Sequence, residues 1–501
     1  MAEITKPNPE RPFTVPKFIW IGLAVLTLIA YFTGLGLPLV GPDEPRYAQV
    51  AREMWQAGDW VTPTLGGHTW FEKPALLYWL EIAAYNLFGV NEITARLGPA
   101  LCGLGSIAAM YLLGRALDRK ELGLWLAAVT ASTLGIIVFA HGASFDILIT
   151  FTLAGSLVGF FWYDRRGSTL GLAAFYVFIG VSLLAKGLIG IVFPFAIVAF
   201  YFVLSRKLPN RRFLISFLWG TALALAIAAV WYVPVYLRNG WTFVEEFLIQ
   251  HHFQRFLSNK YRHPQPFYFF LWVLPLMTLP WLPFAIAGMA TAARSLTKRE
   301  PNKEAINAAI PLPVFALSWV AVPLVFFSLS GSKLPGYILP AVPGLIIFAA
   351  VWIDQATRRL KIVGIATAAF LLAGMIVLAV FVVPPFADAE SIKPLIAAAD
   401  SQGMTSEKIF ALHCVPHGAE FYAAGRLLRD ASGEQKKLYS GPELKTEMER
   451  AGVTRALVII TANYPDDVTV HRFIKSEKLA ANGELAIYSV ELLSGPTQPV
   501  H

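Results

Sequence analysis

The stretch FIWIGLAVLTLIAYFTGLGLPLVGPDEPRYAQVAREM, residues 18–54, changes character at Gly41. Its first part is apolar enough for a membrane or a deep core, and its second part opens with Asp43, Glu44 and Arg46. An apolar run of this length is typical of a helix that spans a bilayer. Charges at the end of such a helix are costly unless they line a wet cavity, so they are candidates for function.

The composition extends this interpretation to the whole chain. Of 501 residues, 56% are hydrophobic and only 15% are charged, which is unlike a soluble globular protein. Apolar stretches of about 17–25 residues recur between short basic loops, as in a multi-span membrane protein. We therefore predict about eleven to thirteen spans. They lie near residues 18–39, 97–114, 122–139, 147–163, 169–185, 188–204, 213–237, 267–292, 309–329, 335–353 and 362–384.

A cleaved signal peptide is the alternative for the first apolar stretch, because Lys6, Arg11 and Lys17 precede it. No A-x-A-like site follows the stretch, and many further spans do, so we favour an uncleaved span.

The basic residues predict the orientation. With a cytoplasmic N-terminus, every basic loop cluster falls on the cytoplasmic side, as the positive-inside rule requires. The net charge of +8 then reflects topology and attraction to lipid headgroups. Basic runs with interleaved aromatic residues are missing from the sequence, which argues against nucleic acid as a partner. The clusters are Arg115, Arg119 and Lys120; Arg165 and Arg166; Arg206, Lys207, Arg211 and Arg212; Arg294, Lys298, Arg299 and Lys303; and Arg358, Arg359 and Lys361.

Two domains are expected. Residues 1–386 form the transmembrane domain, whose first outer loop covers about residues 40–96, and residues 387–501 form a small α/β domain on the outer face. The second domain alternates segments typical of helices (IKPLIAAAD, ELKTEMERAG) with segments typical of strands (KIFALHCV, RALVIITA). Cys102 lies in a span and Cys414 far away in the second domain, so we expect no disulfide framework.

Five charged residues interrupt apolar or aromatic contexts in the outer loops. They are Asp43, Lys73, Asp146, Arg255 and Lys333. Two anions and three cations from separate positions on one membrane face predict a site for an anionic ligand.

Other polar residues have two interpretations. Arg46 and Arg52 could pair with Glu53 or Asp59, and Glu44 could be a helix-start residue or a site residue. Lys186 could reach the membrane interface or contact ligand, whereas His68 and His263 are expected in loops.

Four motifs resemble one known family. PDEPRYAQVAREM, WFEKPALLYWL, HHFQRF and SKLPGYILP are similar to motifs of the lipid A 4-amino-4-deoxy-L-arabinose transferases, which are related to the protein O-mannosyltransferases. The resemblance implies an α-helical polytopic membrane protein of the GT-C glycosyltransferase fold. It also implies a bacterial inner-membrane enzyme whose active site faces the periplasm. Its sugar donor is carried on undecaprenyl phosphate, and its acceptor is lipid A or a related glycolipid.

The resemblance also assigns roles. Asp43 corresponds to the acidic catalytic residue of the first loop and Asp146 to the second acidic position. Lys73, Arg255 and Lys333 fall on donor-phosphate positions. Tyr337 lies close to Lys333 in the sequence and is included with them.

Family members can also bind a zinc-like divalent metal, between the Glu that precedes this Lys and a His of a later outer loop. Here Glu72 is present, but Gln250 stands where the His is expected, with His251 and His252 adjoining. A metal needs several ligands in a fixed geometry. No cofactor is therefore required, and a divalent metal such as zinc stays possible.

Three functions compete. The favoured one transfers 4-amino-4-deoxy-L-arabinose from undecaprenyl phosphate to lipid A phosphate. The second uses the same fold with another sugar, such as galacturonic acid or mannose, and lipopolysaccharide core or protein as acceptor. The third is a transporter or channel, which should place polar residues at midspan rather than at one face.

The position of Asp43 also predicts its setting. It is expected where the first span meets the outer loop, so that a membrane helix holds its backbone. Glu44 should then point elsewhere, because adjacent residues lie about 100° apart around a helix.

Overall fold

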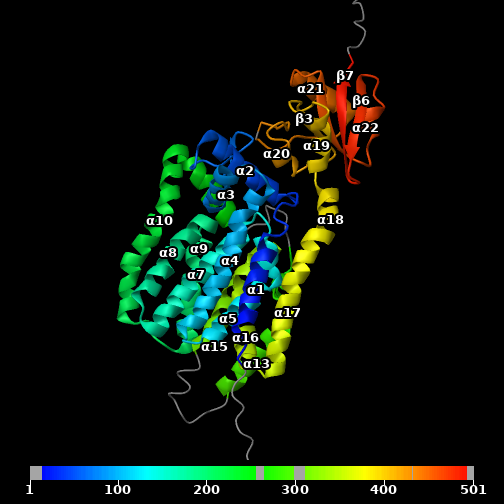
Figure 1. Ribbon diagram of the computed structural model, residues 1–501. Coiled ribbons are helices and arrows are strands. Elements are labelled where there is room, and N and C mark those ends of the chain that lie inside the picture. Colours follow the sequence, from blue (N-terminus) through cyan, green and yellow to red (C-terminus); the bar gives the residue numbers. More distant parts are fainter. Residues whose placement is uncertain (1–13, 255–264, 298–310, 432, 494–501) are drawn as a thin grey trace, which may run out of the picture.

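The computed structural model describes residues 14–254, 265–297, 311–431 and 433–493. A bundle of long helices forms one body, and a smaller α/β domain sits at one end of it (Figure 1). Arg255, which was predicted to bind the donor phosphate, lies outside the described residues, as does His263.

The bundle is built from the apolar stretches. Every predicted span overlaps a helix or a helix pair. The helices are α1 (Lys17–Phe32), α4 (Glu92–Ala116), α5 (Lys120–Ala131), α6 (Leu134–Ala140), α7 (Phe145–Arg166), α8 (Thr169–Lys186), α9 (Ile189–Ser205), α10 (Arg211–Phe243), η1 (Val244–Gln254), α12 (Phe269–Met277), α13 (Leu282–Thr297), α15 (Pro311–Leu329), η2 (Pro335–Ala341), α16 (Val342–Asp354), α17 (Arg358–Val377), η3 (Leu378–Val382) and α18 (Val383–Glu390).

In the described part of the chain, seven helices are long and apolar enough to cross a membrane. The number rises to nine if each of two bent pairs is one span. The pair α5 and α6 bends by 61°, and the pair of α12 with Leu282–Ser295 bends by 108°. The predicted spans at 122–139 and 267–292 are therefore broken rather than straight. Apolar helices α1 and α9 are shorter, with 16 and 17 residues.

The first outer loop is itself largely structured. It contains α2 (Asp43–Ala57), a two-stranded hairpin of β1 (Thr64–Leu65) and β2 (His68–Thr69), and α3 (Leu76–Phe88). Helix α2 ends at Gly58, whose φ of 64° is the left-handed conformation that glycine adopts readily. Helix α3 is formed by the aromatic and apolar sequence LLYWLEIAAYNLF.

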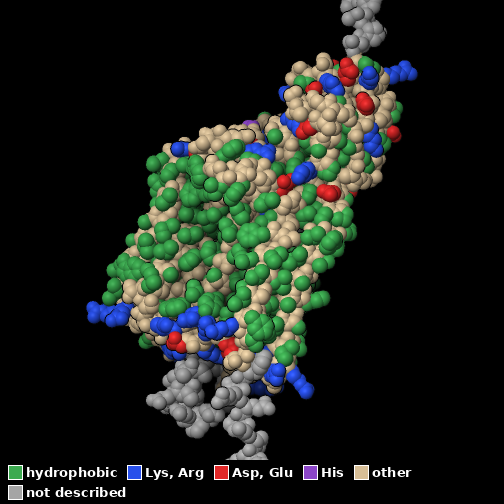
Figure 2. All heavy atoms as spheres, viewed as in Figure 1, with side chains coloured by type: hydrophobic (Ala, Val, Ile, Leu, Met, Phe, Trp, Pro, Cys, Tyr) green, Lys and Arg blue, Asp and Glu red, His purple; other side chains and the backbone are tan. Residues whose placement is uncertain are grey.

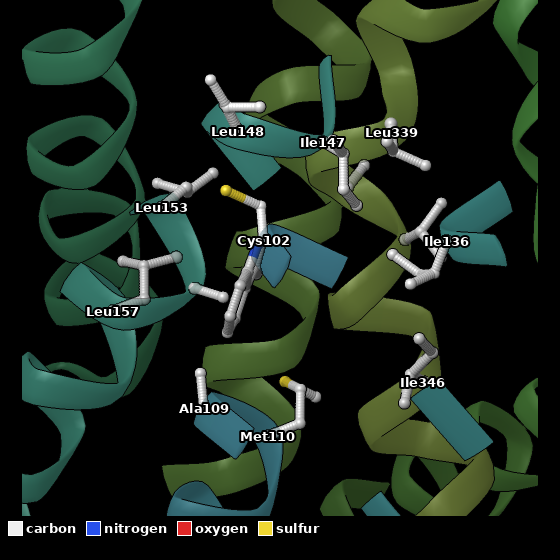
Figure 3. Close-up of a cluster of buried hydrophobic side chains, with 14 of the residues drawn as sticks. Cys102, Ala109, Met110, Ile136, Ile147, Leu148, Leu153, Leu157, Leu339 and Ile346 are labelled. Atoms are coloured by element: carbon white, nitrogen blue, oxygen red, sulfur yellow. The ribbon is translucent and has the colours of Figure 1, made fainter. Parts of the chain in front are cut away.

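The bundle core is apolar and closely packed. Side chains from α4, α6, α7, η2 and α16 meet in it, among them Cys102, Met110, Leu153 and Ile346 (Figure 3). At Gly114 a Cβ atom would lie 2.3 Å from the backbone nitrogen of Gly123, so α4 and α5 approach through two small residues. This kind of contact lets membrane helices pack closely.

Charge is distributed along the long axis of the molecule. Lys and Arg side chains gather at the end of the bundle opposite the α/β domain, and hydrophobic side chains cover the surface between the two ends (Figure 2). Two ion pairs join residues at or next to helix ends here: Arg166 with Asp118 at 2.6 Å, and Lys361 with Glu121 at 3.0 Å.

The C-terminal domain contains a five-stranded sheet of order β4-β3-β5-β7-β6. Strand β3 is parallel to β4 and β5, whereas β7 is antiparallel to β5 and β6. The predicted helices and strands of this domain are confirmed. The elements are α19 (Lys393–Ser401), β3 (Ile409–Leu412), α20 (Ala419–Tyr422), β4 (Lys437–Leu438), α21 (Gly441–Arg450), β5 (Arg455–Thr461), α22 (Asp466–Thr469), β6 (Ile474–Ala481) and β7 (Leu485–Leu492).

Both faces of this sheet are covered. Phe410 and Val458 pack with Leu444 of α21 on one face, while Ile409 packs with Leu395 of α19 on the other. Successive strand residues point to opposite faces, so the continuous apolar runs IFAL and ALVII suit a sheet buried on both sides. Helix α18 ends at Glu390, and α19 begins at Lys393.

Candidate functional site

A cavity of about 1340 Å³ lies where the first outer loop, the beginning of α7, the end of α8 and the C-terminal domain meet. It brings together most of the described residues that the sequence predicted. Asp43, Glu72, Lys73, Asp146 and Tyr337 all line it.

Asp43 forms an ion pair across the first turn of α2. Its carboxylate lies 2.6 Å from the guanidinium of Arg46, which also donates a 2.8 Å hydrogen bond to the carbonyl of Pro42. The guanidinium lies 5.6 Å from the centre of the Trp70 ring. Burial lowers the pKa of Arg46, but the carboxylates of Glu72 and Asp43 outweigh this and raise it. Arg46 is therefore a permanent cation in the cavity wall.

The predicted setting of Asp43 is wrong in one respect. Helix α1 ends at Phe32, and Asp43 begins a separate helix, α2. The residues between them bend away because Gly34 and Gly41 adopt positive φ angles of 86° and 69°. The backbone of Asp43 is thus held by α2 rather than by a membrane span.

Asp146 forms the second ion pair, with Lys186. The first turn of α7 meets the last turn of α8, because these two neighbouring helices are antiparallel. Ser144 caps α7 by accepting a 3.1 Å hydrogen bond from the Asp146 backbone N–H. The Lys186 ammonium lies 4.9 Å from the centre of the Tyr337 ring. Of the two interpretations of Lys186, the structure favours the one that places it in the site.

Gly336 lets the backbone approach this pair. A Cβ atom there would lie 2.1 Å from Oδ2 of Asp146, so a side chain at this position would displace the carboxylate. The SKLPGYILP segment therefore contributes a close backbone approach in addition to Tyr337.

Glu72 and Lys73 stand side by side before α3. Their side chains are 14% and 16% exposed, and the Lys73 ammonium lies 3.5 Å from Oε1 of Glu72. Both residues face the same cavity as the Asp43–Arg46 pair.

Lys333 has a different position. Its side chain is buried, and its ammonium donates a 2.6 Å hydrogen bond to the carbonyl of Ser330. Ser330 and Ser332 line the cavity, whereas Lys333 is not among the lining residues of the described chain.

The metal ligands predicted from the resemblance are only partly described. Glu72 lines the cavity, and Gln250 of η1 lines it too. The side chains of His251 and His252 lie outside the described part. Among the residues that are described, no group of three or more His, Cys, Asp or Glu side chains could hold a metal ion. A metal site at Glu72 stays a prediction.

Glu44 has a clear structural role. It accepts hydrogen bonds from the Arg96 guanidinium at 2.8 and 3.1 Å, from Ala143 N–H at 2.7 Å and from Val40 N–H at 3.2 Å. One largely shielded carboxylate, 15% exposed, thus joins the chain before Asp43 to α4 and to the loop before Asp146. Glu44 thus has different partners from Asp43, but it lines the same cavity, so the expectation that it points elsewhere is met only for its contacts. The suggested partners of Arg52 are wrong, because its guanidinium binds the carbonyl of Phe421 at 2.7 Å.

Sequence reasoning missed several lining residues. Glu246 comes from η1, and His417 and Glu434 come from the C-terminal domain. For His417 the sequence offers only a weak signal. It follows a buried strand of a parallel pair, and the carboxyl ends of such strands carry the ligand-binding loops of α/β domains.

Comparison with known proteins gives a consistent picture. A family model described as dolichyl-phosphate-mannose-protein mannosyltransferase matches residues 17–249. The chain is 30% identical over 372 residues to an undecaprenyl phosphate-alpha-4-amino-4-deoxy-L-arabinose arabinosyl transferase of Shewanella sediminis, which covers 70% of this chain and 64% of the relative. A transferase of the same description from Pseudomonas fluorescens is 31% identical over 376 residues, covering 71% and 65%. The match therefore spans slightly less than two thirds of the length of these relatives.

Two solved structures share the fold. The crystal structure of ArnT from Cupriavidus metallidurans bound to undecaprenyl phosphate has a TM-score of 0.77 and 23% sequence identity, covering 95% of this chain and 98% of that one. The apo oligosaccharyltransferase of Archaeoglobus fulgidus has a TM-score of 0.53 and 15% identity, covering 89% and 69%. The fold predicted from the motifs is confirmed.

Proposed function

We propose that this chain, which has the GT-C fold, is a polyprenyl-phosphate-sugar glycosyltransferase that transfers 4-amino-4-deoxy-L-arabinose from undecaprenyl phosphate to a phosphate of lipid A. The observation that carries the proposal is the single cavity in which the Asp43–Arg46 and Asp146–Lys186 pairs meet Lys73. The names of the relatives supply the donor and the sugar.

The donor phosphate is proposed to bind Lys73, Arg255, Lys333 and Tyr337. Transfer breaks the bond between the anomeric carbon and the phosphate oxygen, whose electrons stay on the departing undecaprenyl phosphate. Fixed cations near that oxygen lower the barrier, by about 2.7–4 kcal/mol for one preorganised donor in other enzymes. Lys333 can take part only if its buried ammonium reaches the cavity, which it does not line in the described structure.

The acceptor decides what Asp43 does. A phosphate monoester has a second pKa near 6, so it is largely ionised at neutral pH and attacks without losing a proton. Asp43 then orients the acceptor or binds the amino group of the sugar. If the acceptor is a hydroxyl, Asp43 takes its proton as that oxygen attacks the anomeric carbon, which contributes about 10²–10⁴-fold.

The lipid tail of the donor is proposed to leave the cavity through its apolar wall. Val138, Val192 and Phe326 line that wall on helices of the bundle, and Leu188 lines it from the turn between α8 and α9. Long apolar side chains of this kind suit a polyprenyl chain, as they would suit bilayer lipid.

We also infer that the chain lies in the bacterial inner membrane with the cavity and the C-terminal domain on the periplasmic side. The support is the gathering of Lys and Arg at the opposite end of the bundle (Figure 2), because basic loops stay cytoplasmic.

Mass spectrometry of lipid A from cells with and without the gene tests the proposal. The expected result is a gain in mass of one aminoarabinose on a lipid A phosphate, which disappears in the deletion strain. A gene-dependent gain of galacturonic acid or mannose on the core or on protein would support the other transferase hypothesis. Unchanged lipid A in both strains would contradict the proposed acceptor.

A further inference from the structure

A loop of the C-terminal domain forms part of the cavity. It leaves the sheet at the carboxyl end of β3, where the chain passes to α20, and it carries His417 into the cavity wall beside Asp43 and Arg46. Strands β3 and β5 are neighbours, and the chain leaves their carboxyl ends in opposite directions: from β3 toward β4 on one side, and from β5 toward β6 on the other. Ligands of open α/β sheets bind at such switch points.

Helix α20, which follows the loop, is held against α2 and the segments beside it. The Arg52 guanidinium donates to the carbonyl of Phe421 at 2.7 Å and lies 4.1 Å from the centre of that ring. The hydroxyl of Tyr422 accepts a 2.8 Å hydrogen bond from Leu39 N–H and donates to Glu92 at 3.1 Å. His417 is thus fixed relative to the helix that carries Asp43.

The imidazole itself is available. It is half-buried, and its ring has no hydrogen-bond partner within the described residues. Burial and the nearby Arg46 cation lower the pKa of His417, against the smaller raising effects of Glu420 and Asp43. The ring is therefore neutral at neutral pH, where it carries one N–H donor.

The structure assigns Arg46 and His417 to one subsite, and we propose that together they bind the phosphate monoester of the acceptor. Arg46 supplies the charge and those guanidinium N–H donors that do not already bind Pro42 and Asp43, and His417 supplies one further N–H. This assignment rests on the proposed function, which it extends by making the C-terminal domain part of the acceptor site.

The geometry favours the acceptor over the donor at this subsite. The donor is anchored by a polyprenyl tail, which must lie among the apolar side chains of the bundle. His417 belongs to a domain whose body lies beyond the end of the bundle (Figure 1). A phosphate on a glycolipid headgroup that projects from the membrane surface approaches from that side.

Equilibrium binding of lipid A to the purified full-length protein in nanodiscs tests the assignment. His417→Ala should weaken binding about tenfold or more, the effect of one hydrogen bond to a charged group. His417→Gln, which keeps an N–H donor, should recover part of the affinity. His68→Gln is the matched control, because His68 is an exposed histidine that packs on Gly433 of the same domain but does not line the cavity.

Dephosphorylated lipid A separates phosphate recognition from other contacts. Wild-type protein should bind it more weakly than lipid A, and His417→Ala should reduce that difference. Lipid A affinity that is unchanged in His417→Ala would overturn the assignment, as would failure of the wild-type protein to bind lipid A at all.

Kinetics with the undecaprenyl-phosphate-linked sugar keep the two proposals apart. His417→Ala should raise the acceptor KM about tenfold and leave the donor KM unchanged. A rise in the donor KM alone would place His417 in the donor site and overturn the assignment. Wild-type protein that binds lipid A through His417 but transfers no sugar to it would contradict the proposed function alone.

Discussion

Removal of the Glu44 carboxylate should destabilise the protein, whereas removal of the Asp43 charge should not. Glu44 is the ionic partner of Arg96, whose side chain is 5% exposed and which also donates to the carbonyls of Leu35 and Pro38 at 3.0 Å. In Glu44→Ala the carbonyls remain, but a buried cation loses its counter-charge. Breaking a buried pair in this way costs about 3–5 kcal/mol.

The magnitude can be expressed as a melting temperature. Unfolding entropy is about 2.1 cal/mol/K per residue, so a chain of 501 residues loses about 1 °C per kcal/mol. Glu44→Ala should therefore melt about 3–5 °C below the wild type. The Asp43 side chain is 52% exposed and its pair with Arg46 is worth about 0–1 kcal/mol, so Asp43→Asn should melt within about 1 °C of the wild type.

The assay is size-exclusion thermostability of the purified protein in detergent, followed by transfer measured per folded molecule. Asp43→Asn should lose transfer while staying folded, and Glu44→Gln should lose stability with a smaller loss of transfer per folded molecule. A residual rate of a few per cent in Asp43→Asn would indicate a phosphate nucleophile, and a loss beyond about a thousandfold a hydroxyl. If Glu44→Ala melts at the same temperature as the wild type, the structural role of Glu44 is refuted. If Asp43→Asn transfers sugar at the wild-type rate, the catalytic role of Asp43 is refuted.

Three further outcomes are expected. Lys73→Ala should weaken donor binding or turnover at least tenfold, because the lipid phosphate then lacks a cation in a site of low dielectric; an unchanged donor KM and kcat would count against this. Asp146→Asn and Lys186→Met should each reduce the transfer rate. Because the two residues act as one pair, the fold-loss in the double variant should be smaller than the product of the two single fold-losses. A fold-loss equal to that product would show that the residues act independently. Glu81 lies in α3, whose 13 residues are too few to span, and burial together with the Glu44 charge raises its pKa. The folded state then binds the proton more tightly than the unfolded chain does. The stability that this group contributes is therefore lost as pH rises above about 4.3, where the unfolded chain begins to release its proton. Glu81→Gln should melt at a higher temperature than the wild type at about pH 8 but not at about pH 4.5.

The membrane helices were predictable because the bilayer imposes a simple rule on sequence. A stretch that crosses must be apolar for about 20 residues, and the loops that stay cytoplasmic must be basic. Breaks inside a span leave a weaker trace. At Ser132 and Thr133 the hydroxyls bond back to the carbonyls of Ala128 and Val129, and α5 gives way to α6 with a bend of 61°. Composition alone could not distinguish that bent pair from one straight helix.

The site was predictable in part, for a related reason. A charge beside an apolar stretch stands out in sequence, and this singled out Asp43, Lys73 and Asp146. The partner of each charge depends on which helices lie side by side. Lys186 meets Asp146 because the end of α8 returns to the start of α7, whereas the sequence alone left both the membrane interface and ligand contact open.

His417 illustrates a further limit of sequence reasoning. Nothing in the sequence VPHGAEF marks His417 as a residue of this cavity. The residues beside it in the cavity wall, Asp43 and Arg46, lie in the other domain, more than 300 residues earlier in the chain. The docking of α20 on α2 through Arg52 and Phe421 creates the relationship. Two weak local signals, a histidine after a buried parallel strand and an arginine one turn after an aspartate, become one candidate phosphate subsite only when that contact places them together. A domain that is separable in sequence thus forms part of the wall of the cavity.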